Sequence, residues 1–296
     1  MYNGAPYLQA ALESVLSQEG VDLEMIVVDD GSTDDTPEIL RAYESRDRRV
    51  RVITQGNMGL TRALIRGCAA ARGALIVRQD ADDVSLPGRF RWQAAALADD
   101  PGLALVSCGT ECVGPRDEVL YTSMPTANSE TATRDLLGGV DGPVHGSVMF
   151  RRGPYEAVGG YRTAFRYAQD SDLWRRLVQH GRLGYLPQIL YRYRVRPAGI
   201  SAGWRNLQQE FDRLARACSD ARLAGADEGP LVAQAWQLAA SKPALGAPTG
   251  SVAYFVGACL LDRRDRRARS YLLEALREKP MSARVWAALA RSLLIS

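Results

Sequence analysis

The chain has 296 residues, of which 46% are hydrophobic, and this length allows one large α/β domain with a smaller appendage. Its net charge is only +3 and its basic residues, nearly all arginines, do not form the dense cluster of a nucleic-acid-binding surface, so we expect no nucleic acid as a partner. Five cysteines without CxxC spacing fit a reducing, cytoplasmic setting, and no apolar run is long enough to span a membrane, so any contact with the inner face of the cytoplasmic membrane would be peripheral.

Helix and strand patterns alternate over the first hundred residues. Apolar stripes and start signals predict helices at 7–18, from Thr33 onward and over 60–71. Short β-branched apolar runs predict strands at 23–28, 50–54 and 74–78. This alternation is typical of a Rossmann-like, mostly parallel sheet flanked by helices, in which ligands bind where the strands end.

The later elements continue this α/β pattern and then change to helices alone. A helix over 84–100, strands at 103–108 and 148–151, and a helix at 170–180 are predicted. We expect a catalytic domain over 1–203 and a helical C-terminal region over 204–296, interrupted by a Gly- and Pro-containing stretch at 241–250. Residues 251–296 resemble one tetratricopeptide-like hairpin, although a simple docking appendage explains them equally well.

The sharpest chemical signal is an acidic cluster that follows the strand at 74–78. Asp80-Ala81-Asp82-Asp83 places three carboxylates within four residues, where they repel one another unless a cation or solvent compensates. Mg²⁺ and Mn²⁺ prefer oxygen ligands and bridge to phosphates, so this position suits a metal–diphosphate complex. The alternative is a solvated acidic turn that caps the next helix.

Two further acidic segments are weaker when each is taken alone. Asp29-Asp30-Gly31-Ser32 also follows a strand, where Asp30 could accept a hydrogen bond from a base or a ribose, or could cap a helix. Asp170 and Asp172 begin a helix that contains Trp174, so one of them could be a general base or could complement the helix dipole.

Together these segments resemble the family 2 glycosyltransferases with the GT-A fold, especially bacterial members that build surface polysaccharides. The resemblance covers residues 1 to about 201. The matching segments, in chain order, are Tyr2-Asn3-Gly4, Ile26 to Asp34, Asn57 to Thr61, Gln79 to Asp83, His145 to Met149, Gly159-Gly160-Tyr161 and Asp170 to Trp174.

The resemblance implies an inverting transferase that uses a nucleotide sugar and a glycan or lipid-linked acceptor. Asp170 would be the catalytic base, and Asp80 and Asp82 would hold Mn²⁺ or Mg²⁺, the ribose and the diphosphate. Tyr2 and Asp30 would contact the nucleotide base. An Asp at this position suits the imide of uracil, so the nucleotide would be UDP. The remaining expected donor-binding residues are Asn3, Asn57 and Ala81, and the residues expected on the acceptor side are His145 and Trp174.

Four positions depart from the family pattern. Met1 directly precedes Tyr2-Asn3, where the family has an apolar strand, so we expect the first strand to be missing from this chain. Gln169 replaces the usual Glu before the base, and Ile65 stands where Asn is common. Arg196 stands where many members have a His near the metal, and Arg could pair with phosphate but would not bind a metal.

Two other functional readings remain open at this point. A chain of this fold could bind a sugar nucleotide without catalysis. The helical end could instead recruit polysaccharide-assembly proteins or contact anionic lipid through the basic stretch Arg263, Arg264, Arg266, Arg267 and Arg269, unless that stretch is simply a solvated helix face.

Overall fold

The computed structural model describes residues 1–125, 128–196, 205–240 and 252–295. The chain forms two compact units that are not continuous in sequence. The first contains the described residues within 1–110, 124–192 and 209–242, and the second contains those within 111–123, 193–208 and 243–296. The expected domain boundary at 203 and the expected break at 241–250 lie outside the described residues.

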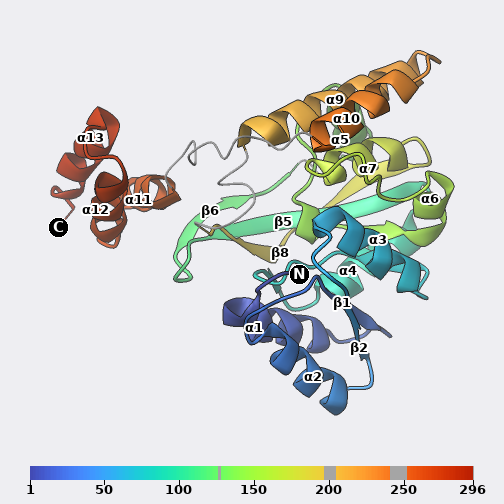
Figure 1. Ribbon diagram of the computed structural model, residues 1–296, viewed down its shortest axis with the longest axis horizontal. Coiled ribbons are helices and arrows are strands. Elements are labelled where there is room, and N and C mark those ends of the chain that lie inside the picture. Colours follow the sequence, from blue (N-terminus) through green and yellow to red (C-terminus); the bar gives the residue numbers. More distant parts are fainter. Residues whose placement is uncertain (126–127, 197–204, 241–251, 296) are drawn as a thin grey trace. The chain divides into compact units, whose positions relative to one another are not determined.

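The chain begins with a small parallel sheet and its helices (Figure 1). Strand β1 (Met25–Asp29) pairs in parallel with β2 (Val50–Thr54). Helices α1 (Ala5–Leu16) and α2 (Thr36–Arg46) cover this pair, and their shared core is Leu8, Leu12, Val27, Leu40 and Val50. On the other edge of β1, the amino group of Met1 donates to the Val28 carbonyl (2.6 Å) and Asp30 N donates to the Met1 carbonyl (2.7 Å).

A larger sheet has the strand order β3-β7-β5-β8-β4, with β6 paired to β5. Its strands are β3 (Leu75–Val77), β4 (Val84–Ser85), β5 (Leu103–Val113), β6 (Val119–Ser123), β7 (Met149–Arg151) and β8 (Arg182–Arg194). The pairs β3–β7, β5–β7 and β4–β8 are antiparallel. The structure is therefore a mixed α/β fold with more antiparallel pairing than the expected mostly parallel sheet.

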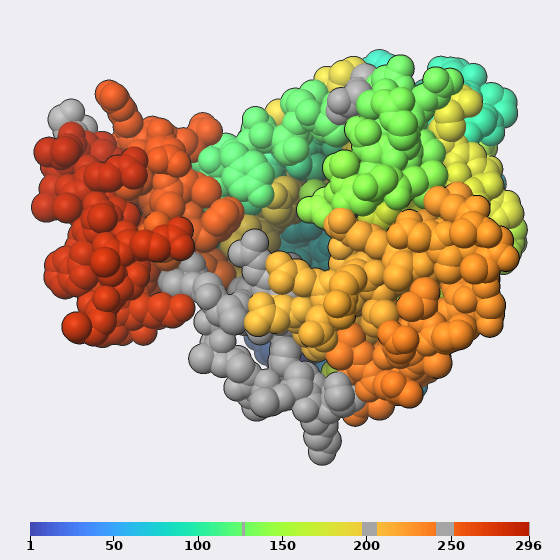
Figure 2. All heavy atoms as spheres, turned by 90° about the horizontal axis from the view of Figure 1, so that it is seen from above, coloured from blue at the N-terminus to red at the C-terminus, as the bar shows by residue number. Residues whose placement is uncertain are grey.

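Helices flank this sheet, and several of them lie in the segments that connect its strands. They are α3 (Leu60–Ala70), α4 (Arg89–Asp99), α5 (Ser129–Leu137), α6 (Arg152–Ala157), α7 (Gln169–Leu177), α9 (Arg205–Leu223) and α10 (Gly229–Ala240), with the 3₁₀ turn η1 (His145–Ser147) between α5 and β7. Helices α9 and α10 lie side by side on one surface of the first unit (Figure 2). No helix among the described residues is long and apolar enough to cross a membrane.

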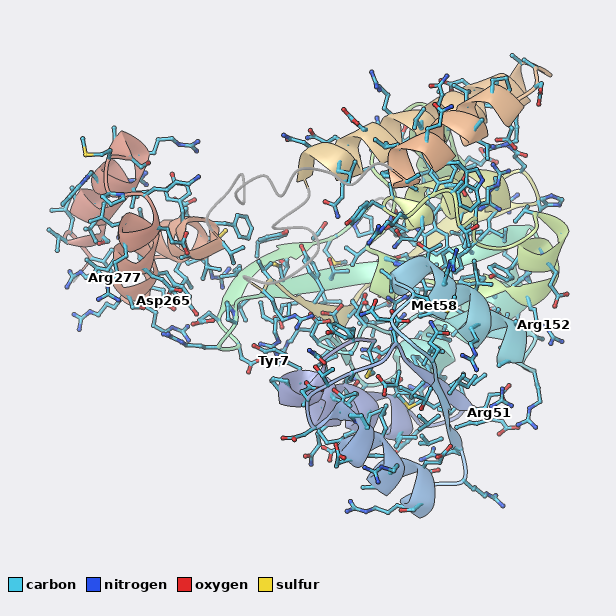
Figure 3. All side chains as sticks on the ribbon, viewed as in Figure 1. Tyr7, Arg51, Met58, Arg152, Asp265 and Arg277 are labelled. Carbon is cyan, nitrogen blue, oxygen red and sulfur yellow. The ribbon has the colours of Figure 1, made fainter. Side chains whose placement is uncertain are left out.

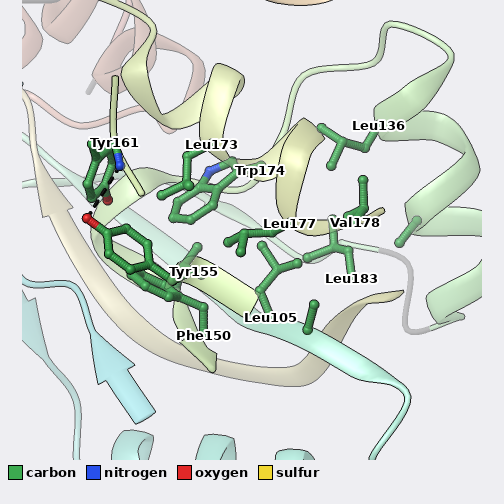
Figure 4. Packing of buried hydrophobic residues seen from close by; sticks show 13 residues of the cluster. Leu105, Leu136, Phe150, Tyr155, Tyr161, Leu173, Trp174, Leu177, Val178 and Leu183 are labelled. Carbon is green, nitrogen blue, oxygen red and sulfur yellow. Dashed lines mark hydrogen bonds between the residues drawn. The ribbon is translucent and has the colours of Figure 1, made fainter. Parts of the chain in front are cut away.

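The main core lies between the large sheet and α7 (Figure 4). Leu173, Trp174 and Leu177 of α7 are buried against Phe150 of β7 and Leu105 of β5. A fully buried apolar side chain of this size stabilises the fold by roughly 1.5–3 kcal/mol. Helix α7, which begins at Gln169, is therefore held firmly, and its first turn is a fixed platform for the side chains that it carries.

The second unit has a core of its own. Helices α11 (Val252–Asp262), α12 (Ala268–Glu278) and α13 (Ala283–Ser292) pack together, with Leu260 and Leu272 fully buried. Gly257 permits the close approach of α11 and α12, because a Cβ there would meet Leu272 Cγ at 2.8 Å. These helices agree with the two or three short helices expected over 251–296, and the tetratricopeptide-like reading stays a prediction.

Candidate active site

The acidic cluster forms a tight loop between β3 and β4. Arg78 Nη2 contacts Asp80 Oδ1 at 2.6 Å, and Gln79 Nε2 donates to the carbonyl oxygens of Asp80 (3.0 Å) and Asp83 (2.9 Å). Burial raises the pKa of the Asp80 carboxyl, but the charge and hydrogen bond of Arg78, together with other nearby groups, outweigh burial, and that pKa is lowered overall. Asp80 is therefore a partly exposed carboxylate whose charge is stabilised by an adjacent cation.

Asp83 has a structural position in this loop. Its side chain is buried, and Tyr191 of β8 donates its hydroxyl to Asp83 Oδ2 at 2.7 Å. The backbone N–H of Asp80 donates to the same Tyr191 oxygen at 3.3 Å. Of the three clustered carboxylates, Asp83 is thus the one that ties the loop to β8.

A fully buried arginine lies beneath the loop. Arg89, the first residue of α4, donates to the carbonyls of Arg78 (3.0 Å) and Gly146 (2.7 Å) and to Ser85 Oγ (2.9 Å). Its guanidinium carbon lies 4.6 Å from the centroid of the Tyr191 ring. Arg89 therefore joins the acidic loop, α4 and the turn that carries His145.

In the segment after β1, the acidic side chains accept hydrogen bonds from other residues of the protein. Asp30 is buried and accepts from Gln55 Nε2 (2.6 Å), Met58 N (2.8 Å) and Gly59 N (2.8 Å). Met58, labelled in Figure 3, and Gly59 immediately precede α3. Asp30 thus satisfies backbone donors at the N-terminus of α3 in this structure. The contact of Asp30 with a nucleotide base stays a prediction, which nucleotide binding would test.

The first residues of the chain lie against this segment. Asn3 donates its backbone N–H to Ser32 Oγ (2.9 Å), and Asn3 Oδ1 accepts from Thr33 N (2.8 Å). Asn3 has a positive φ of 51°, and Tyr2 beside it is 49% exposed. Tyr2, between Met1 and Asn3, is therefore exposed to solvent near the segment that follows β1, a position that would allow its ring to stack on a base.

His145 belongs to an aromatic cluster behind the acidic loop. Its Nε2 is 2.8 Å from the Tyr161 hydroxyl, and its ring lies 5.7 Å from that of Trp174. Burial, and then the charge of Arg78, lowers the pKa of His145 to about 3, so the imidazole is neutral at physiological pH. Trp174 is only 1% exposed and supports His145 from the core rather than offering a face to an acceptor.

Asp170 lies in the first turn of α7. Ala168, two residues earlier at the N-cap of α7, has the left-handed conformation, and Asp170 Oδ1 accepts from Ser171 N at 2.9 Å. Burial raises the pKa of the Asp170 carboxyl, and the negative charge of Asp212 on α9 raises it further. A carboxylate with a raised pKa is a stronger proton acceptor, which is the property that a general base requires.

One charge influences residues from three separate sequence motifs. The charge of Arg78 acts on Asp80, His145 and Asp170, which are far apart in the sequence. The sequence motifs predicted no role for Arg78, Tyr161 or Tyr191. An arginine at the end of an apolar strand is a signal that could have been used for Arg78, but no local pattern links Tyr191 to a loop more than a hundred residues away.

The acidic loop fits a divalent cation that arrives with phosphate. Among the residues that the structure describes, no three His, Cys, Asp or Glu side chains gather as a complete metal site. Mg²⁺, however, commonly takes only one or two protein carboxylates and completes its shell with water and substrate phosphates. Asp80 and Asp82 offer such a pair within one turn of chain.

Comparison with known proteins gives one family and several relatives. Residues 1–159 match the family model described as glycosyl transferase family 2. The EpsE protein of Bacillus subtilis (strain 168), named as a glycosyltransferase, is 32% identical over 202 residues, which are 66% of this chain and 70% of the relative. The chondroitin synthase of Pasteurella multocida (strain Pm70) is 28% identical over 192 residues, which are 64% of this chain but only 19% of the synthase.

Solved structures share the fold. The TarS 1-349 structure from S. aureus has a TM-score of 0.59 at 16% identity, with 99% of this chain and 86% of that chain covered. The mannosyltransferase PcManGT from Pyrobaculum calidifontis, in complex with GDP-Man and Mn²⁺, has a TM-score of 0.57 at 21% identity, with 99% and 85% covered. At these identities the likeness concerns the GT-A fold alone.

Proposed function

Because the chain belongs to glycosyl transferase family 2, we propose that it transfers a sugar from a nucleoside-diphosphate sugar to a hydroxyl of a glycan or lipid-linked acceptor in bacterial surface polysaccharide synthesis. The observation that supports the proposal is the partly buried carboxyl of Asp170 in the first turn of α7, whose pKa is raised by burial and whose charge interacts with that of Arg78 beside the acidic loop.

The proposed reaction is a single inverting displacement. Asp170 accepts the proton of the acceptor hydroxyl, whose oxygen forms the new bond to the anomeric carbon as the bond to the nucleoside diphosphate breaks. A divalent cation held by Asp80 and Asp82 would supply positive charge to the leaving diphosphate. Neutral His145 lies beside this centre, where it could orient a sugar hydroxyl by a hydrogen bond.

We propose UDP as the nucleotide of the donor. An Asp that follows β1 suits the imide of uracil, and exposed Tyr2 follows Met1, whose carbonyl accepts from Asp30 N. Structures of similar fold contain UDP or UDP-GlcNAc in one protein and GDP-Man with Mn²⁺ in another. Mn²⁺ or Mg²⁺ is accordingly the proposed cofactor.

The test is release of nucleoside diphosphate from a panel of sugar nucleotides with Mn²⁺ or Mg²⁺, in the presence of oligosaccharide or lipid-linked acceptors. We expect turnover that EDTA abolishes and that Asp170→Asn lowers by at least about a hundredfold, since a general base typically contributes about 10²- to 10⁴-fold. Asp82→Ala should also lower turnover, since it removes a proposed ligand of the metal. Glu38→Gln, an exposed acid on α2, is the matched control and keeps full activity. Nucleotide binding without turnover on any acceptor would favour the non-catalytic reading.

We also propose that the C-terminal helices touch the inner face of the cytoplasmic membrane. Arg263, Arg264 and Arg266 are exposed in the turn between α11 and α12. Arg269 bonds to the carbonyls of Ser292 and Leu293 and so joins this turn to the end of α13, where Leu293 and Leu294 are 65% and 85% exposed. Exposed arginines beside exposed leucines suit an anionic lipid surface.

A further inference from the structure

The guanidinium of Arg78 lies inside the proposed metal centre. Its side chain is only 10% exposed, its Nη2 contacts Asp80 Oδ1 at 2.6 Å, and its Nη1 donates to the Gln79 carbonyl. Its Nε has no hydrogen-bond partner among the described residues. A permanent cation therefore already contacts one of the two carboxylates that would bind a divalent ion.

The backbone holds this cation firmly in place. Arg78 N donates to the Val148 carbonyl (3.0 Å), which extends the pairing of β3 with β7, and the Arg78 carbonyl accepts from buried Arg89 (3.0 Å). The guanidinium also bonds to the carbonyl of the next residue, Gln79. Arg78 can therefore move away from Asp80 only by breaking this ion pair, whose Arg78 side chain is mostly buried.

A divalent ion that binds Asp80 alone meets two obstacles. It must displace or share the Asp80 oxygen that Arg78 contacts, and it experiences repulsion from a guanidinium charge that cannot be lost by deprotonation. A bound diphosphate changes both conditions, because its negative charge attracts the metal and the guanidinium together. The free energy of metal binding should therefore depend strongly on whether the nucleotide is present.

We propose that Arg78 occupies Asp80 in the free protein and so makes the divalent cation bind together with the nucleoside diphosphate rather than alone. The inference rests on the proposed function, since it requires a nucleotide and a metal at this site. Arg78 is in this view a positioning residue that links metal binding to donor binding. The centre would then stay free of metal until a donor is present.

The test measures Mn²⁺ affinity by electron paramagnetic resonance, with and without UDP, after subtraction of the Mn²⁺–UDP complex that forms without protein. In the wild type we expect UDP to raise Mn²⁺ affinity at least about tenfold, within the usual range of coupling between two ligands. In Arg78→Gln, Mn²⁺ alone should bind at least about fivefold more tightly, and the effect of UDP should shrink by the same factor. Calorimetry provides an internal check, because Mn²⁺ must raise UDP affinity by the same factor.

Two variants separate this electrostatic role from a loss of structure. Arg78→Lys keeps the charge and should keep most of the coupling, whereas Arg182→Gln removes the same charge from a pair with Asp100 elsewhere and should leave the coupling unchanged. Tight binding of Mn²⁺ to the wild type without nucleotide overturns the inference even if Arg78→Gln does not fold. Failure of the wild type to bind UDP with Mn²⁺ at all would instead contradict the proposed function.

Discussion

At the scale of single residues, Asp170 shows how the fold maintains a reactive group. The carboxyl is partly buried near Asp212, and Ser171 N is the donor to its Oδ1. Burial and the Asp212 charge both favour the protonated form, and together they outweigh the hydrogen bond from Ser171. The charged form of Asp170, which is needed to accept a proton, therefore lowers the free energy of unfolding.

The sign of this cost can be tested with Asp170→Asn. Because the folded-state pKa is raised, the stability due to this carboxyl is fully present below the unfolded pKa and is lost as the pH rises through the folded pKa. The variant should be inactive yet melt higher than the wild type at neutral pH, by about 2–4 °C for each kcal/mol recovered, and this gain should vanish as the pH falls toward about 4. Scanning calorimetry across pH measures it, and an equal or lower melting temperature at neutral pH would contradict the burial argument.

The pH dependence of turnover depends on the same group. Turnover should fall as the pH is lowered through the raised pKa of Asp170, hence at a higher pH than the ordinary value of about 4 for Asp would give. His145 should cause no further change in turnover near neutral pH, since its pKa of about 3 leaves the imidazole uncharged there.

At the scale of elements, α7 is fixed by a buried ion pair as well as by its apolar face. Asp172 and Arg176 are almost fully buried, and Arg176 Nη2 contacts Asp172 Oδ2 at 2.5 Å. Arg162 lies 3.8 Å from Asp172 Oδ1 and also pairs with Glu228 (2.7 Å), immediately before α10. This chain of charges joins the helix that carries Asp170 to the helices on the surface of the first unit.

Removal of Asp172 should therefore destabilise the fold rather than act on chemistry directly. Asp172→Ala leaves Arg176 buried without its partner, and breaking such a pair typically costs about 3–5 kcal/mol of unfolding free energy. Urea denaturation followed by circular dichroism would measure the loss. Glu156→Ala, which removes a pair at 3.8 Å with the partly exposed Arg152, is the control and should cost less than about 1 kcal/mol.

At the scale of the whole molecule, the elements with local signals were predicted best. The strand at 50–54 agrees with β2 to the residue, and the helices at 60–71 and 170–180 agree with α3 and α7 within a few residues. Strand β8 was not predicted, because Pro187 and several charged residues interrupt its alternation. Its antiparallel pairing with β4, which brings Tyr191 to Asp83, depends on contacts far apart in the sequence.

The candidate site was predicted only in part, because some of its contacts join segments that are far apart in the sequence. Asp80, Asp82 and Asp170 lie in motifs that a local reading detects, and their roles remain predictions. The internal bonds of Asp30 and the burial of Trp174 depend on how distant segments pack, which no motif encodes.

The charge distribution of the whole chain leads to the membrane prediction. Residues 252–295 contain nine basic and four acidic side chains, an excess of five, although the whole chain has a net charge of only +3. The protein should sediment with vesicles that contain anionic phospholipid and not with neutral ones, and binding should weaken with salt. Replacing Leu293 and Leu294 by Ser should weaken it further, whereas equal binding to neutral vesicles, or none to anionic ones, would exclude this role.

The arginine beneath the acidic loop limits how this enzyme can be altered by directed evolution. Arg89 uses Nε, Nη1 and Nη2 at once, toward Gln93, Ser85 and the carbonyls of Arg78 and Gly146. Lysine has one nitrogen and cannot make these bonds from separate positions. In a library of random substitutions, position 89 should therefore return only arginine among active clones, and new sugar preferences should arise at positions that make no contact with it.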